Sequence, residues 1–113
     1  MGSLNGFLHK DICLESRSFS LKLQKFDNGY FVSISEGSDK LGSMVVSLAA
    51  GPSPITTTII PSKTESLFLK LLAERISTRI RGIAIVSAYI RNELETDTAK
   101  LLMTEIVEII QND

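Results

Sequence analysis

The chain is poor in the residues that build most catalytic and metal sites. It has no tryptophan, one cysteine (Cys13) and one histidine (His9) among 113 residues. A single cysteine cannot form an internal disulfide, which favours a reducing compartment, the cytoplasm with the nucleus as a second location. His9 and Cys13 lack the third group that orients a catalytic pair, and they are too few for a zinc site. We therefore expect no catalysis and no metal.

The chain also lacks an excess of one charge sign and any long apolar run. Lys and Arg together number 12, and Asp and Glu together number 13. The basic excess that is typical of nucleic-acid binders is therefore absent. No apolar run approaches the roughly 20 residues of a membrane helix, and the first residues lack the apolar core of a signal peptide. We expect neither a nucleic acid nor a membrane as a partner.

Two sequence patterns resemble enzyme motifs only superficially. The segment from Gly37 to Ser43 spaces its glycines like a phosphate-binding loop, but no lysine follows Gly42 and the segment leads into a predicted strand rather than a helix. Glu93 and Glu95 form a carboxylate pair just before a predicted helix, where acidic side chains complement the helix dipole. Neither pattern supplies the convergent polar groups of an enzyme pocket.

The residues that are present indicate one folded domain over residues 1–113. A hydrophobic fraction of 43% with a charged fraction of 22% excludes intrinsic disorder. The stretch from Gly82 to Ile90 is apolar or small at both alternating sets of positions. This pattern predicts a central strand that is covered on both faces. We expect residues 1–10 to form a loose lead-in and residues 11–15 a short strand.

Alternating apolar and polar residues predict a hairpin over residues 19–35. Asn28-Gly29 tolerates the positive φ angles of a type I′ turn. That turn would place Leu23 opposite Ile34 and would make the two aromatic residues near the turn a cross-strand pair, Phe26 with Phe31. One face of the hairpin would be apolar: Leu21, Leu23, Val32 and Ile34. The other would carry the two aromatics among Lys22, Gln24, Ser33 and Ser35.

The rest of the chain predicts two more strands, a helix, the central strand and a last helix. The strands cover residues 43–49 and 55–60, and the helices cover about 64–80 and 96–111. Ser62 to Glu65 fits a capping box for the first helix. The predicted fold class is α+β, a mainly antiparallel sheet of five to six strands with two helices packed on it, in the order β-β-β-β-α-β-α.

From residue 19 onward the chain resembles the family of proteasome assembly chaperones 3 and 4. The resemblance rests on Phe31-Val32-Ser33-Ile34, on the step Lys40-Leu41-Gly42-Ser43 into a strand, and on the run from Ile55 to Ile60, followed by helix, strand and helix in the same order. The third member is the closer likeness. The sequence departs from it at Gly51-Pro52-Ser53-Pro54, between two strands.

This resemblance implies a non-enzymatic chaperone without a cofactor. Such a protein would pair with assembly chaperone 4 as a heterodimer, or with itself as a homodimer. The dimer would promote formation of the α ring of the 20S proteasome by binding an α subunit, the α5 subunit. The alternative function is a roadblock or longin-type dimeric adaptor for small GTPases or trafficking complexes. Those folds place a helix between early strands, whereas four strands precede the first predicted helix here.

We expect a dimer interface on the mixed face of the hairpin, because aromatic residues supply much of the binding energy of interfaces. The candidate interface residues are Phe26, Phe31, Ser33 and Val45. In the alternative interpretation, the aromatics pack under the first ten residues. The candidates for docking to the proteasome are Lys40, Leu41, Arg75 and Arg79. For the two arginines, the alternative is that they complement the helix dipole and face solvent.

Overall fold

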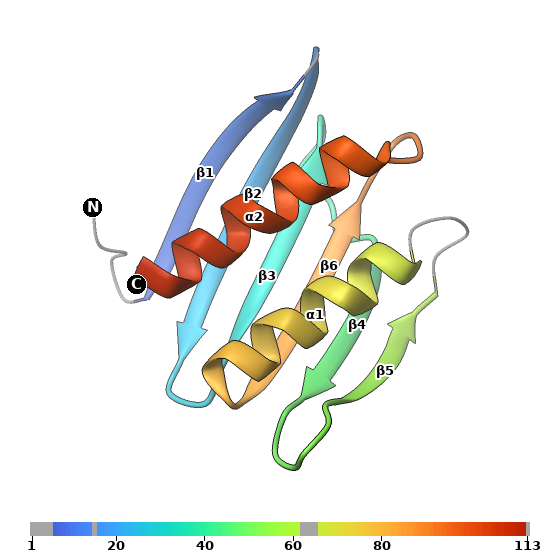
Figure 1. Cartoon of the computed structure of the whole chain (residues 1–113). Coiled ribbons are helices and arrows are strands. Elements are labelled where there is room, and N and C mark those ends of the chain that lie inside the picture. The colour runs from blue at the N-terminus through green and yellow to red at the C-terminus, as the bar shows by residue number, and fades with distance from the viewer. Residues whose placement is uncertain (1–5, 15, 62–65, 113) are drawn as a thin grey trace.

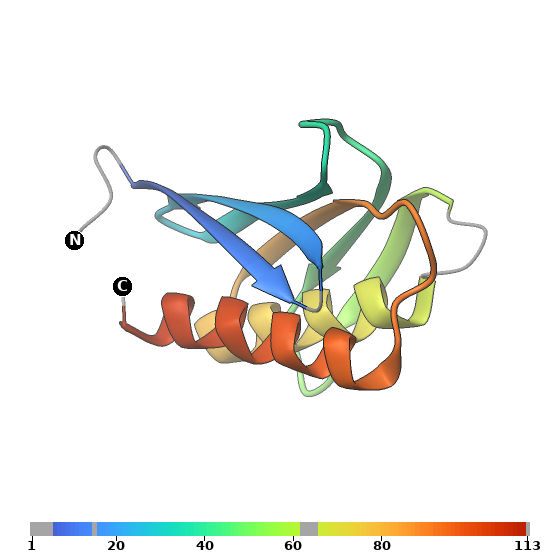
Figure 2. The ribbon, with the colours of Figure 1, turned by 90° about the horizontal axis from the view of Figure 1, so that it is seen from above.

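A six-stranded sheet carries two helices on one of its faces (Figures 1 and 2). This computed structural model describes residues 6–14, 16–61 and 66–112. The elements in chain order are β1 (Phe7–Leu14), β2 (Arg17–Phe26), β3 (Gly29–Glu36), β4 (Ser43–Leu48), β5 (Ile55–Ile60), α1 (Ser66–Ile80), β6 (Ile83–Tyr89) and α2 (Thr96–Asn112). The predicted α+β class is confirmed, with five strands rather than four before the first helix. The predicted capping box lies in residues 62–65, outside the described residues.

The strand that was predicted to be central is central. The order across the sheet is β1-β2-β3-β6-β4-β5, so β6 lies between two separate groups of strands. It runs parallel to β3 and antiparallel to β4, and the other neighbouring strands are antiparallel. One strand late in the chain therefore joins the β1-β2-β3 meander to the β4-β5 hairpin.

Both helices cover the same face of the sheet. In Figure 1, α1 lies over β6 and β4, and α2 crosses the strands of the meander. The core between helices and sheet contains, among others, Leu21, Val32, Val86, Leu72 and Ile106, each 0% exposed. The prediction that β6 is covered on both faces is wrong, because Ile85 and Tyr89 on the side away from the helices stay partly exposed.

The first ten residues are not a loose lead-in as far as the structure describes them. Residues 7–14 form β1, which pairs antiparallel with β2 along its whole length. β1 is longer than the predicted strand at residues 11–15 because Phe7 to Lys10 continue the pairing. It is an edge strand, so its apolar alternation is weak and the sequence does not reveal its start.

The hairpin of β2 and β3 has the predicted faces but not the predicted pairing. Phe26 pairs with Gly29 and Gln24 pairs with Phe31, so the two aromatics are not directly opposite each other. The loop consists of Asp27 and Asn28, and neither Asn28 nor Gly29 has a positive φ. Gly29 serves another purpose, because a Cβ there would lie 2.3 Å from the backbone oxygen of Ile83 in β6. The glycine allows β3 and β6 to approach, not the chain to turn.

A partly buried ion pair ties the far end of the hairpin to the chain after β6. Arg17 donates two hydrogen bonds to the Glu36 carboxylate, at 2.9 and 2.8 Å, and the backbone N–H of Arg91 donates a third at 3.0 Å. Arg17 also donates to the carbonyl of Asn92 at 2.7 Å. The Arg17 guanidinium holds the pKa of Glu36 below its ordinary value, against the opposing effect of burial. The cluster fixes the connection from β6 to α2.

Candidate functional site: the open face of the sheet

The face of the sheet away from the helices, here called the open face, is apolar over the half that is next to the β2-β3 loop. Strand pairing places two rows of side chains side by side there. The first row contains Phe26, Ile83, Leu48 and Ile55. The second contains Phe7, Gln24, Phe31, Ile85, Val46 and Thr57. In the part of the chain that the structure describes, both helices lie on the other side of the sheet (Figure 2).

The exposure of these side chains is high for apolar residues. Phe26 is 56% exposed, Ile55 69%, Phe7 42% and Leu48 40%. Single exposed apolar residues are ordinary on protein surfaces, but a continuous group of them marks an interaction site. Their continuity follows from the pairing of neighbouring strands, so it is a property of the fold and not of one loop.

The other half of the open face is polar on β1, β2, β3 and β6. Its rows there contain His9, Lys22, Ser33 and Ser87, followed by Asp11, Ser20, Ser35 and Tyr89. On β4 and β5 the first of these rows continues with the apolar residues Met44 and Ile60. The connection from β3 to β4, residues 37–42, rises above this half (Figure 2). Ser35 holds the connection through hydrogen bonds with both the N–H and the carbonyl of Lys40, at 3.3 and 2.9 Å. The open face is therefore divided into an apolar half and a polar half that a loop overhangs.

Gly42 sets how closely the 37–42 connection returns to the sheet. Its N–H donates to the Ser87 hydroxyl at 3.1 Å, and a Cβ there would lie 2.2 Å from the carbonyl oxygen of Ala88. No larger residue fits this contact without displacing backbone. The Lys-Leu-Gly-Ser step in the sequence thus has a physical reason, because it brings the loop against the end of β6.

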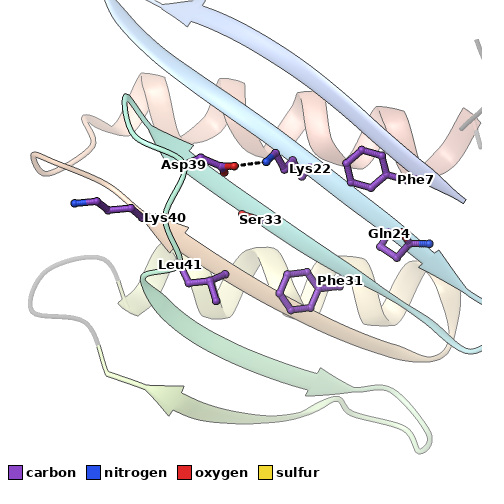
Figure 3. A pocket seen from close by; sticks show the side chains of 8 residues that line it. All are labelled: Phe7, Lys22, Gln24, Phe31, Ser33, Asp39, Lys40 and Leu41. Atoms are coloured by element: carbon purple, nitrogen blue, oxygen red, sulfur yellow. Dashed lines mark hydrogen bonds and ion pairs between the residues drawn. The ribbon is translucent and has the colours of Figure 1, made fainter. Parts of the chain in front are cut away.

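A hollow of about 340 Å³ lies where the loop meets the apolar half. Phe7, Phe31 and Leu41 form its apolar lining, and Lys22 and Asp39 form an ion pair at its rim (Figure 3). The shape would accept a side chain from a partner surface more readily than a small ligand, because the hollow is open towards solvent on one side.

The predicted interface residues do not all share this face. Phe26, Phe31 and Ser33 are on it, and Ser33 is only 8% exposed between its neighbours. Val45 is instead 1% exposed in the core beneath the helices, so it is not accessible from the open face. Its neighbour Val46 occupies the position in the second apolar row. The alternation of that strand favoured the opposite orientation, because Met44, Val46 and Leu48 form its apolar set and Val45 shares the other set with Ser43 and Ser47.

The first ten residues do not cover the aromatics, as far as they are described. β1 lies beside β2 in the plane of the sheet, and it adds Phe7 to the apolar half. Phe7 is the functional candidate that the sequence analysis missed. Its position follows only once β1 is known to start at residue 7.

The predicted docking residues fall into two separate places. Lys40 and Leu41 are in the loop over the open face, where Leu41 is 63% exposed and the Lys40 Nζ lies 5.2 Å from the centre of the Tyr89 ring. Arg75 and Arg79 are exposed on α1, on the other side of the sheet. The structure does not bring the two pairs together.

One group of side chains has the composition of a hydrolase triad without its geometry. His9 Nε2 lies 3.0 Å from an Asp11 oxygen and 2.9 Å from the Ser20 hydroxyl. The same ring nitrogen faces both partners, whereas a triad uses the opposite nitrogens of the imidazole. Among the described residues no group of three His, Cys, Asp or Glu side chains could hold a metal ion. In the described part of the chain, no helix is long and apolar enough to span a bilayer.

Comparison with known proteins decides the family. The family model for proteasome assembly chaperone 4 matches residues 18–90, which run from β2 to the end of β6. The chain belongs to the proteasome assembly chaperone 4 family. The assignment to the third member is therefore wrong, because the pattern of hydrophobic and small residues that carried it does not distinguish the two members. The search of curated proteins found no significant match.

A solved structure agrees with this family at the level of the fold. The chain superposes with a TM-score of 0.62 on a structure described as "Crystal Structure of a Novel Chaperone Complex for Yeast 20S Proteasome Assembly". The match covers 94% of this chain and 98% of the other, at 9% sequence identity. Membership of the proteasome assembly chaperone 4 family makes this protein a non-enzymatic proteasome assembly chaperone, as predicted.

Proposed function

We propose that this proteasome assembly chaperone works as a heterodimer with an assembly chaperone 3 homologue, and that the open face is the dimer surface. The observation that carries the proposal is the pair of apolar rows on a sheet face that no helix covers. A homologous subunit would have a similar sheet, and two such sheets would bury both rows between them. Sheets pack face to face about 10 Å apart with interleaved side chains.

The division of the open face would set the orientation of the partner. The apolar rows supply area that is removed from water, which drives association. The polar half and its loop would meet the rim of the partner, where solvated contacts are the rule. The hollow between Phe7, Phe31 and Leu41 would receive one large side chain of the partner, in the manner of a central anchor.

The second part of the proposal is that the dimer binds the α5 subunit of the 20S proteasome and promotes formation of the α ring. Support comes from the family and from the similar yeast structure, which is described as a chaperone complex for 20S proteasome assembly. The surface for this contact is one of the two docking candidates, the loop with Lys40 and Leu41 or the α1 surface with Arg75 and Arg79. Neither is needed to cover the apolar rows.

Co-expression tests the dimer and the subunit separately. The tagged chain is expressed with an assembly chaperone 3 homologue and the α5 subunit, and the co-purified proteins are identified by mass spectrometry. Leu48→Asp places a charge in the first apolar row, where Leu48 is 40% exposed. Leu101→Asp is the matched control, because Leu101 is 51% exposed on α2.

The expected result is that Leu48→Asp loses the homologous subunit and Leu101→Asp retains it. If both variants retain it, the open face is not the dimer surface. If small GTPases co-purify in place of proteasome subunits, the adaptor function is correct and the proposal fails.

A further inference from the structure

The two helices lie side by side on the sheet and leave a groove between them, here called the helix groove. Figure 1 shows α1 and α2 next to each other over one face, and Figure 2 shows both in the same layer beside the sheet. The helix groove has a volume of about 460 Å³. Its lining consists of Arg75 from α1 and of Lys100, Met103, Thr104, Val107, Glu108 and Gln111 from α2. It therefore follows α2 for about 16 Å, since a helix rises 1.5 Å per residue, or about three turns.

The apolar part of the lining comes from α2. Met103 and Val107 are one turn apart and both are partly exposed. Met103 also packs against the hydrophobic core, so its position is supported from below. A methionine adapts its shape to different apolar neighbours. The helix groove thus offers a place for apolar side chains of a ligand.

The charged side chains of the helix groove have a positive sum. Arg75 and Lys100 line it from opposite helices, and Arg79 follows Arg75 on the same side of α1, one turn later. The one carboxylate in the lining is Glu108. Among the described residues none of these four side chains forms an ion pair within 4.0 Å. The Arg79 guanidinium lies against the side-chain amide of Gln111, which is neutral and leaves the charge uncompensated.

We propose that the helix groove binds an acidic amphipathic helix of a partner protein. Grooves between helices receive the apolar stripe of such a helix, with anchors at every third or fourth position. These anchors would contact Met103 and Val107. Acidic side chains beside the stripe would meet Arg75, Arg79 and Lys100, so charge complementarity would select the partner and fix its orientation. Bare phosphate groups fit less well, because they would leave the apolar part of the lining in water.

The chain itself does not offer such a helix to a second copy. The apolar stripes of α1 and α2 are buried against the sheet. On the outer side of α1, Leu67 and Leu71 are 67% and 48% exposed, but Lys70 and Arg75 flank them. On α2, Leu101 is the one large apolar side chain that is exposed among the described residues. A second copy that docked by α1 would bring cations to cations, which costs free energy, so the occupant is expected to be a different protein.

This inference rests on the proposed function only in one respect, namely that the dimer occupies the open face and leaves the helices accessible. It is therefore tested on the isolated chain. The probe is a fluorescein-labelled peptide of leucine, glutamate and alanine with blocked ends, about fifteen residues long because shorter helices are marginal in water. Its leucines recur at every third or fourth position, and its glutamates lie beside them.

Two control peptides separate charge from apolar pattern. The first replaces every glutamate by lysine. The second keeps the composition but spreads the leucines around the helix. Fluorescence polarisation measures the affinity, and the methyl signals of Met103 and Val107 in NMR spectra report where the peptide binds.

The glutamate peptide is expected to bind with a dissociation constant of about 100 μM or lower, and to shift both methyl signals. Arg75→Glu should weaken it about tenfold, whereas Lys25→Glu, the same change of charge on β2, should not. The double variant Arg75→Glu with Lys100→Glu should prefer the lysine peptide, a reversal that loss of the fold cannot produce. Phe26→Ala should bind the glutamate peptide normally, so a failure of the dimer proposal leaves this result intact.

Four outcomes overturn the inference. The first is no saturable binding of the glutamate peptide at 1 mM, roughly the weakest affinity of interest. The second is equal affinity for either control peptide or for Arg75→Glu. The third is tighter binding to vesicles of phosphatidylserine and phosphatidylcholine that Arg75→Glu abolishes, which would identify an anionic membrane surface as the ligand. The fourth is a homodimer that Arg75→Glu changes and Phe26→Ala does not in sedimentation equilibrium, which would identify a second copy as the occupant.

Discussion

Truncation of Phe26 should weaken the heterodimer without unfolding the chain. Phe26 is the last residue of β2 and is 56% exposed on the open face. Its cross-strand partner is Gly29, so no side chain shields it from that direction. A partner sheet on the open face would bury the part of the ring that solvent now reaches.

The exposed fraction sets the magnitude. A phenylalanine offers about 200 Å², so 56% exposure leaves about 110 Å² for the partner to bury. At about 25 cal/mol/Å² this area contributes at most about 3 kcal/mol. Because alanine retains its Cβ, we expect Phe26→Ala to lose about 2 kcal/mol of association, or roughly 30-fold in the dissociation constant. The cost to folding should be about 1 kcal/mol, since the ring is only partly buried.

Two measurements separate association from folding. Titration calorimetry with the assembly chaperone 3 homologue gives the dissociation constant, and urea unfolding of the isolated chain gives its stability. Leu101→Ala is the control, because Leu101 has a similar exposed fraction, 51%, on α2. The reasoning is refuted if Phe26→Ala stays folded and binds with wild-type affinity, or if Leu101→Ala weakens binding as much.

Three further predictions concern adjacent faces, a buried charge and a close contact. Val45→Ala should lower the unfolding free energy by about 2 kcal/mol because it leaves a core cavity, and it should leave the affinity of the heterodimer unchanged. Val46→Ala should weaken the heterodimer and leave the unfolding free energy nearly unchanged. If both variants change both quantities alike, as measured by urea unfolding and calorimetry, the assignment of Val45 and Val46 to opposite faces is wrong. Glu36→Gln should lose about 2 kcal/mol at pH 7. The pKa of Glu36 is lowered from 4.5 in the folded chain, so the wild-type advantage is present above pH 4.5 and is lost as the pH falls through the lower folded value; urea unfolding at pH 7 and pH 3 checks this, and a difference that stays constant would refute it. Gly29→Ala should cost about 2 kcal/mol or more, because its Cβ would lie 2.3 Å from a backbone oxygen of β6; a melting temperature like that of the wild type would show that the strands can separate.

The faces of the hairpin could be predicted from the sequence, but its pairing could not. Leu21 and Leu23 share the helix-covered face with Val32 and Ile34, as the alternation predicts. The observed pairing differs by two residues from the predicted one, and a shift of two residues keeps every side chain on its face. The alternation therefore contains no information on the shift. The turn was expected to supply it, but Gly29 meets a requirement set by β6, more than fifty residues later.

The candidate site was predictable only in part, because alternation gives the face of a side chain but not the neighbour of its strand. Phe26, Phe31 and Ser33 follow from alternation alone. The choice between Val45 and Val46 depends on the neighbour of β4, which is β6 and not the strand that precedes it in sequence. The position of Phe7 on the open face depends on the pairing of β1 with β2. The weak alternation of this edge strand does not predict that pairing. The apolar residues on both faces of β6 predicted cover on both sides, but the helices cover one face only, and Ile85 and Tyr89 on the other face stay partly exposed.

The position of β6 has a consequence for how the chain acquires its structure. Until residues 83–89 have been synthesised, the meander β1-β2-β3 and the hairpin β4-β5 have no strand between them. Partners such as Phe31 and Ile85 are more than fifty residues apart, and contacts of such separation form slowly. The apolar rows of the open face are divided between the two halves, so the surface that a partner would bind does not exist on a nascent chain. If the open face is the dimer surface, as proposed, pairing with another subunit is expected only after the last strand has been synthesised.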